Sequence, residues 1–163
     1  MGHNSVRKIN IVFICSGNIC RSPMAEAVFK QMVEQAGLAD RFEIASAGIG
    51  DWHLGEPPHP GTLDALHRHA VQAVAGKRAQ VVNAPMLARA DYLIAMDEGH
   101  ARELQSFAGA TDGKVSRLLD YAPQVVQRNV PDPYYSERYE EVYSLVEAGS
   151  RGLLEHILRK ERL

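Results

Sequence analysis

The stretch that decides the fold is Cys15-Ser16-Gly17-Asn18-Ile19-Cys20-Arg21-Ser22, which separates a largely apolar run from a segment with helical periodicity. The run Ile9–Ile14 is mostly β-branched and aromatic, as expected of a strand that is buried on both faces. Behind the stretch, the spacing of apolar residues predicts a helix over 22–37, with Ser22 as its cap and Pro23 in its first turn. A strand, a tight loop and a helix in this order predict a bowl of backbone N–H groups that binds a phosphate-sized oxyanion.

Length and composition predict a single globular domain. The chain has 163 residues, of which 45% are hydrophobic and 23% charged. A formal net charge of -2 gives no electrostatic reason to expect nucleic acid or an anionic membrane as partner. No apolar run approaches the roughly 20 residues that span a bilayer, and no secretory signal is recognisable. We therefore expect a cytoplasmic protein with a polar tail over 1–8 and one domain over 9–163.

The cysteines and histidines predict neither a disulfide framework nor a metal site. The 2 cysteines, Cys15 and Cys20, lie in one short loop and cannot join distant parts of a fold. The 7 histidines show no His-Glu-x-x-His spacing, and the two thiols lack a second metal-binding pair. We expect no metal and no cofactor.

The rest of the chain alternates between predicted strands and helices. Strands are expected over 42–47, 91–96 and 114–119, helices over 62–69, 85–90, 98–107 and 139–158, and a proline-punctuated loop over 121–133. Strands separated by helical segments imply parallel pairing with right-handed crossovers, hence a doubly wound three-layer α/β sandwich. Ligands bind beyond the carboxyl ends of the strands in such sheets, and Cys15 follows the first predicted strand.

The loop carries the groups that phosphate-ester chemistry requires. Attack at phosphorus needs a potent nucleophile, neutralised phosphate oxygens and protonation of the leaving oxygen. Cys15 is the candidate nucleophile, because a thiol beside a helix N-terminus and a cation ionises readily. Arg21 can grip two phosphate oxygens with its planar set of donors. Gly17 allows a close turn, and Asn18 is a residue type that tolerates the left-handed backbone.

Each of these features also has an ordinary structural explanation. A lone cysteine near a strand end is commonly a small buried hydrophobe, and Ser22-Pro23 alone is a helix cap. An arginine in the first turn of a helix opposes the helix dipole, so Arg21 needs a reason, and a bound anion supplies one. Together the features favour a catalytic anion-binding loop over these structural explanations. In such a loop the Ser22 hydroxyl would donate a hydrogen bond to the Cys15 sulfur.

Residues 12–26 resemble the active-site signature of the low-molecular-weight protein tyrosine phosphatases. Three further motifs recur in family order, so the resemblance extends from about Ile9 to the last helix. They are Ser46-Ala47-Gly48 with Asp51-Trp52, then Met96-Asp97-Glu98, then Asp132-Pro133-Tyr134-Tyr135. The resemblance implies a flavodoxin-like fold with a four-stranded parallel sheet. It also implies a metal-independent hydrolase of phosphotyrosine and small aryl phosphates that works through a phosphocysteine.

The resemblance implies a role for each matching residue. Cys15 attacks phosphorus, and Asp132 protonates the phenolate and then activates water. The phosphate oxygens are held by Arg21 and by the backbone amides of Ser16, Gly17, Asn18, Ile19, Cys20 and Ser22. Asn18 and Ser46, with Ser22, brace the loop from inside. Lys77 stands where many relatives carry a histidine, which puts one supporting hydrogen bond in doubt.

The residues around Asp132 support its role as a general acid independently of the resemblance. An acid between Pro131 and Pro133 is held by a stiff backbone, as a positioned general acid must be. The alternative is an ordinary turn residue.

The resemblance places Trp52, Tyr134 and Tyr135 in the walls of the substrate cleft, with Ile19 in the loop. Flat aromatic walls would sandwich a phenyl ring and set a depth that phosphoserine cannot span. The alternatives for the two tyrosines are plain surface aromatics or phosphorylation targets. The expected partners are phosphotyrosine-containing proteins or peptides, with phosphate-like oxyanions as inhibitors, and the expected state is a monomer or weak dimer.

Two other activities occur on the same fold. Arsenate reductases relay electrons through additional cysteines, and this chain has none after Cys20. Protein-arginine phosphatases carry a threonine where this chain has Ile19, so Ile19 favours the tyrosine-type substrate. A non-catalytic phosphate-binding domain is the remaining alternative. Cys20 either traps an oxidised Cys15 as a reversible disulfide or merely packs under the loop.

Overall fold

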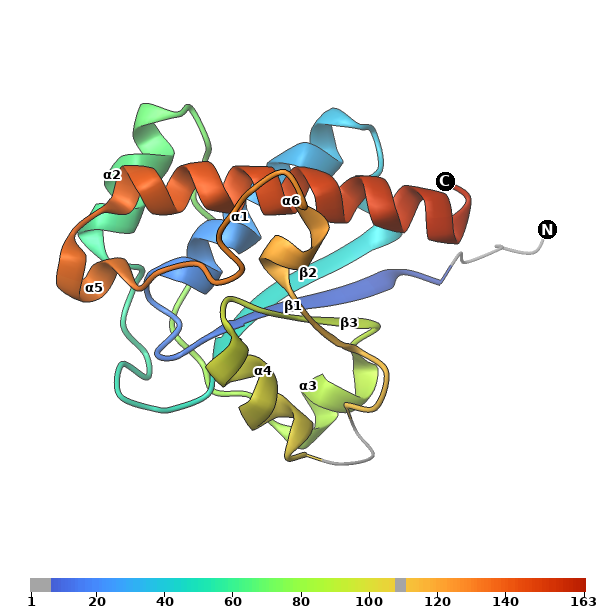
Figure 1. Ribbon diagram of the computed structural model, residues 1–163, viewed down its shortest axis with the longest axis horizontal. Helices are drawn as coiled ribbons and strands as arrows, with labels where there is room; N and C mark the ends of the chain where they lie inside the picture. Colours follow the sequence, from blue (N-terminus) through green and yellow to red (C-terminus); the bar gives the residue numbers. More distant parts are fainter. Residues whose placement is uncertain (1–6, 108–110) are drawn as a thin grey trace.

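The computed structural model describes residues 7–107 and 111–163, which form a parallel β-sheet between two layers of helices (Figure 1). The sheet has 4 strands in the order β2-β1-β3-β4. They are β1 (Ile9–Cys15), β2 (Phe42–Gly48), β3 (Tyr92–Ala95) and β4 (Val115–Arg117). The predicted doubly wound α/β architecture is confirmed.

Helices cover both faces of the sheet. One face carries α1 (Arg21–Gln35), α2 (Pro60–Arg68) and α6 (Tyr139–Glu161), and the other carries α3 (Ala84–Arg89) and α4 (Glu98–Gln105), as Figure 1 shows. The short helix α5 (Pro133–Ser136) precedes α6, and the 3-10 turns are η1 (Ala39–Arg41) and η2 (Leu118–Tyr121). The described helices include none that is long and apolar enough to cross a membrane.

Strand β1 lies at the centre of the sheet because both of its faces are apolar. Ile11 and Phe13 pack into the larger core under α1 and α6, whereas Val12 and Ile14 pack into the smaller core with residues of α3 and α4. This confirms the expectation of a strand buried on both sides. Its neighbours β2 and β3 lie on opposite sides, so the loop after Cys15 sits where ligands bind in such sheets.

Helix α1 begins one residue before the predicted cap. Arg21 is its first residue, and Cys20 precedes it as N-cap without a side-chain hydrogen bond. The expectation that Ser22 caps the helix is therefore wrong. The physical reason lies in the loop itself, because the Ser22 hydroxyl contacts the side chains of Cys15 and Asn18 instead of a backbone N–H.

Several other predicted segments have different bounds in the structure. Strand β4 is shorter than the predicted 114–119, because the chain turns into η2 at Leu118. The predicted loop 121–133 ends in Pro133, the first residue of α5. Of the predicted tail, residues 1–6 lie outside the described residues, and Arg7 forms an ion pair with Asp91.

Candidate active site

Three peptide N–H groups of the loop between β1 and α1 face away from the neighbouring segments. Neighbouring segments bond its carbonyls from outside. The N–H groups of Ile49, Gly50 and His59 donate to the carbonyls of Cys15, Ser16 and Ile19 at 3.0, 3.1 and 2.8 Å. Because C=O and N–H point in opposite directions in a trans peptide, the N–H groups that follow these carbonyls face away from those neighbours. Asn18 supports the turn with a φ of 60°, the left-handed conformation that its residue type predicts.

The Cys15 sulfur lies within hydrogen-bond distance of a hydroxyl that is also contacted by side chains behind the loop. Its Sγ lies 2.9 Å from Ser22 Oγ. The Asn18 amide Nδ2 donates both to Ser22 Oγ (2.8 Å) and to Ser46 Oγ (2.9 Å). Because Ser22 Oγ accepts a hydrogen bond from Asn18, its own O–H is available to donate to the sulfur. The structure thus brings together the residues expected to brace the loop, namely Asn18, Ser22 and Ser46.

A buried ion pair continues this network. Ser46 Oγ donates to the Glu26 carboxylate, and Lys77 Nζ lies 3.4 Å from Glu26 Oε1. Lys77 also donates to the Ser46 carbonyl at 2.8 Å, and the side chains of Glu26 and Lys77 are each only 7% exposed. At the position where many relatives carry a histidine, Lys77 thus supplies a hydrogen bond of its own, to the backbone carbonyl of Ser46.

Replacing Lys77 with methionine is expected to destabilise the fold by about 3–5 kcal/mol, the usual cost of leaving one buried charge unpaired. Urea unfolding measures this loss. Replacing Glu26 with glutamine in the same chain removes the orphaned charge and should restore much of the stability. A Lys77→Met variant as stable as the parent would show that the pair is not needed.

Arg21 joins the loop to the acids on two other segments. Its guanidinium is buried, and Nη1 donates to Asp97 Oδ2 (2.9 Å) and to the Val130 carbonyl (3.0 Å). Nη2 lies 3.5 Å from Asp132 Oδ2. Burial tends to raise the pKa of Asp97, but the His100 backbone N–H and the positive charges of Arg21 and of His100, once that ring is protonated in acid, outweigh it and hold that pKa below its ordinary value. Arg21 at the helix start is thus surrounded by partners that orient it.

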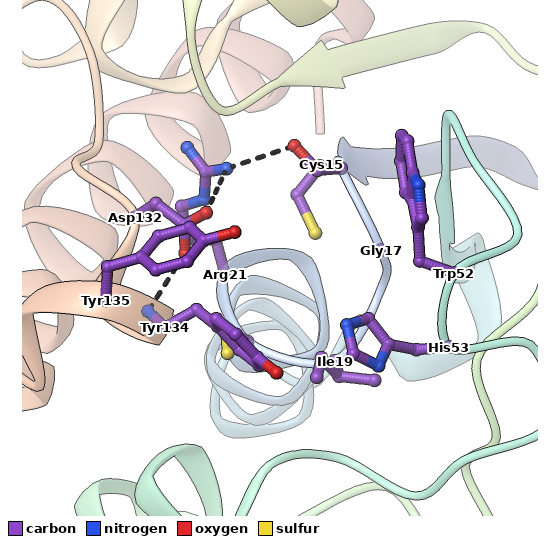
Figure 2. A pocket seen from close by; sticks show the side chains of 11 residues that line it. Cys15, Gly17, Ile19, Arg21, Trp52, His53, Asp132, Tyr134 and Tyr135 are labelled. Atoms are coloured by element: carbon purple, nitrogen blue, oxygen red, sulfur yellow. Dashed lines mark hydrogen bonds and ion pairs between the residues drawn. The ribbon is translucent and has the colours of Figure 1, made fainter.

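Asp132 is placed by the first turn of α5. Its Oδ1 accepts the Tyr134 backbone N–H at 3.0 Å as N-cap, which leaves Oδ2 directed at Arg21. Figure 2 shows Asp132 and Arg21 on one side of the Cys15 sulfur, with Tyr134 and Tyr135 beside them. The three residues predicted to be catalytic therefore face one space.

That space is a cavity of about 380 Å³. Its lining includes all the predicted cleft residues, which are Ile19, Trp52, Tyr134 and Tyr135. Of these, Trp52 and Tyr135 are largely exposed, at 69% and 84%. The walls are thus aromatic and open to solvent, while the floor holds the thiol.

His53 also lines the cavity, and the sequence analysis missed it. Its ring lies 5.5 Å from the Tyr134 ring, and its Nδ1 is 3.2 Å from Glu56 Oε2. A Cβ on Gly17 would lie 2.7 Å from His53 Cδ2, so Gly17 is needed for the close approach of this ring. The position next to Trp52 is the one sequence signal that could have identified His53.

Cys20 lines the same cavity, and its thiol contacts a tyrosine hydroxyl rather than a strong base. Its Sγ is 3.7 Å from the Tyr139 hydroxyl, which in turn contacts His59 Nδ1 at 2.9 Å. Burial raises the pKa of Cys20 to about 11, with the Tyr139 contact opposing that rise. Cys20 is therefore a protonated thiol near neutral pH. Among the described residues, no group of three or more histidine, cysteine or acidic side chains is placed to hold a metal ion.

Comparison with known proteins identifies the family. The family model described as low molecular weight phosphotyrosine protein phosphatase matches residues 10–163. YfkJ of Bacillus subtilis, named as a low molecular weight protein-tyrosine-phosphatase, is 42% identical over 95% of this chain and 99% of its own length. The crystal structure of YfkJ superposes with a TM-score of 0.90, covering 94% of this chain and 96% of that chain.

Two further relatives extend the comparison. PtpA of Staphylococcus haemolyticus, with the same type of name, is 36% identical over 95% of this chain and 97% of its own. A Drosophila arginine phosphatase is 27% identical with a TM-score of 0.82, covering 90% of this chain and 96% of that chain. From the full-length match to the family model and the identity to its named members, the chain belongs to the low molecular weight phosphotyrosine protein phosphatase family.

Proposed function

We propose that this protein hydrolyses phosphotyrosine in proteins through a phosphocysteine formed on Cys15. The observation that carries the proposal is the convergence of Cys15, Arg21 and Asp132 on one cavity with aromatic walls. Membership of the family supports the same activity.

In the first step the Cys15 thiolate attacks phosphorus, and the bond between phosphorus and the tyrosyl oxygen breaks. Asp132, protonated at this point, gives its proton to the departing phenolate. Arg21 and the loop N–H groups bind the equatorial oxygens, where negative charge must be neutralised. The loop residues proposed to hold them are Ser16, Gly17, Asn18, Ile19, Cys20 and Ser22.

In the second step water attacks phosphorus and the sulfur–phosphorus bond breaks. The Asp132 carboxylate takes a proton from the water, which restores the acid for the next cycle. The Cys15 sulfur leaves as a thiolate and accepts the Ser22 hydroxyl proton in a hydrogen bond, because the bond from Asn18 leaves that proton available to donate. The products are inorganic phosphate and the free enzyme.

The cleft favours an aryl substrate. A phenyl ring can lie between the Trp52 and Tyr134 side chains, while the phosphate reaches the loop beneath. Ile19 is buried and apolar, so its side chain cannot hydrogen-bond the guanidinium nitrogen of phosphoarginine. The aromatic walls favour phosphotyrosine over phosphoserine, and Ile19 favours it over phosphoarginine.

Turnover on phosphotyrosine, phosphoarginine and phosphoserine peptides, measured side by side in the presence of EDTA, tests this function. We expect phosphotyrosine to be hydrolysed fastest. Faster release of phosphate from phosphoarginine would replace the tyrosine assignment with the arginine one. If none of the three peptides is hydrolysed, the protein is a non-catalytic phosphate-binding domain instead of an enzyme.

We further propose that inorganic phosphate and vanadate inhibit by occupying the loop, since they present the same oxygens as the substrate. A cytoplasmic location and a monomeric or weakly dimeric state stay predictions. Competitive inhibition kinetics and sedimentation at several protein concentrations check the inhibitor and the oligomeric state.

A redox role for Cys15 and Cys20 is a further prediction. Peroxide would oxidise the Cys15 thiolate to a sulfenic acid, and attack by the Cys20 sulfur would release water and form a disulfide that a thiol reductant opens. Because the pKa of Cys20 is about 11, trapping should become faster as pH rises. After peroxide and then dithiothreitol, Cys20→Ser should recover a smaller share of its own starting activity than the parent. Equal recovery would contradict the protective role.

A further inference from the structure

His100, in the first turn of α4, is a buried histidine that contacts the phosphate loop and that the two chemical steps do not use. It is 7% exposed, and its Nε2 lies 2.8 Å from Ser16 Oγ. On its other side, Asp97 Oδ1 accepts the His100 backbone N–H at 2.9 Å and lies 3.2 Å from His100 Nδ1. The imidazole therefore sits between Asp97 and the loop.

The charge state of this ring follows from its surroundings. Burial, and then the positive charge of Arg21, lower the pKa of His100 to about 4, while Asp97 and Asp132 oppose that shift. The ring is thus neutral near pH 7 and carries a single proton. That proton is favoured on Nδ1, which faces the Asp97 carboxylate although the two atoms are not aligned as a hydrogen bond. Nε2 is then a bare acceptor.

With Nε2 bare, the Ser16 hydroxyl must donate its proton to His100. The Ser16 oxygen is left with lone pairs for Arg21 Nη2, which donates to it at 3.5 Å. Arg21 Nη1 is bonded to Asp97, the same residue that anchors His100. His100 thus contacts both Asp97, which bonds Arg21 Nη1, and Ser16, which bonds Arg21 Nη2.

We propose that His100 is a positioning residue, which acts through Ser16 and Asp97 to hold the Arg21 guanidinium in the orientation that grips phosphate. The inference rests on the proposed phosphatase function. His100 also provides a hold on Arg21 that Asp132 cannot provide throughout the reaction. Asp132 lies 3.5 Å from Arg21 Nη2, but it must be protonated to act as an acid, and it then attracts Arg21 only weakly. The hold through Ser16 does not depend on that proton.

Three variants test the proposal with p-nitrophenyl phosphate as substrate and inorganic phosphate as inhibitor. His100→Leu fills the site without an acceptor and should lower kcat/KM about tenfold, and Ser16→Ala should do the same, as expected for loss of one hydrogen bond. Phosphate inhibition should weaken in both. His100→Gln keeps a carbonyl oxygen that can accept the Ser16 proton, so it should stay within about threefold of the parent.

The double variant separates positioning from simple folding. In the Ser16→Ala background, His100→Leu should cost clearly less than it does in the parent, because the route through Ser16 is already lost and only the one through Asp97 remains. An equal cost in both backgrounds would overturn the proposal. So would full activity in Ser16→Ala, a test that holds even if His100→Leu does not fold. A parent protein without hydrolysis would instead refute the proposed function itself.

Discussion

Replacing Cys15 with serine is expected to reduce hydrolysis of aryl phosphates below detection while the binding of inorganic phosphate is retained. A serine hydroxyl is far less acidic than a thiol and makes a weak nucleophile without an adjacent base. The change in shape is one atom, so the loop amides and Arg21 stay in place to hold the anion. Release of p-nitrophenol measures the first effect, and calorimetric titration with phosphate measures the second.

Retained binding is the control for this experiment. Phosphate should raise the thermal unfolding midpoint of Cys15→Ser as it does that of the parent, since a ligand that binds only the folded state stabilises it. Residual turnover close to that of the parent would show that a different group attacks phosphorus. Loss of phosphate binding would show that the sulfur itself, and not the surrounding loop, creates the anion site.

The local part of the site could be predicted from the sequence. The strand, the loop and the helix are encoded by neighbouring residues, so β1, α1 and the left-handed Asn18 follow from apolar spacing and residue type. The same local reasoning is wrong for Ser22. A cap is the usual role of a serine at that place, but the Ser22 hydroxyl contacts Cys15 and Asn18 of the same loop instead, and the contact with the Cys15 sulfur is the one that the loop chemistry predicted.

The parts that could not be predicted join distant segments. Lys77 meets Glu26 across the core, and His100 reaches Ser16 only because β1 and β3 are adjacent strands that end at the same edge of the sheet. No periodicity encodes such pairs, since each side chain taken alone is an ordinary polar residue. His53 differs, because it is sequence neighbour to a predicted cleft residue, but its direction into the cavity depends on the missing side chain of Gly17.

Replacing Asp132 with asparagine is expected to slow hydrolysis of phenyl phosphate by about 10²–10⁴-fold, the usual contribution of a general acid. Asparagine is as good an N-cap as aspartate, so its side-chain oxygen can keep the hydrogen bond from the Tyr134 backbone and preserve α5. The amide has no proton to give to the leaving oxygen. The comparison of kcat between the variant and the parent therefore reports proton transfer with little disturbance of the fold.

The rate loss in Asp132→Asn, compared between leaving groups, shows whether Asp132 acts as a general acid. p-Nitrophenolate departs readily without a proton, whereas phenolate does not, so the loss should be smallest for p-nitrophenyl phosphate and largest for phenyl phosphate. An equal loss on both substrates would mean that Asp132 acts instead by orienting Arg21, whose Nη2 lies 3.5 Å from its Oδ2. In that case phosphate inhibition should weaken in parallel, whereas loss of the acid alone leaves the grip on the anion intact.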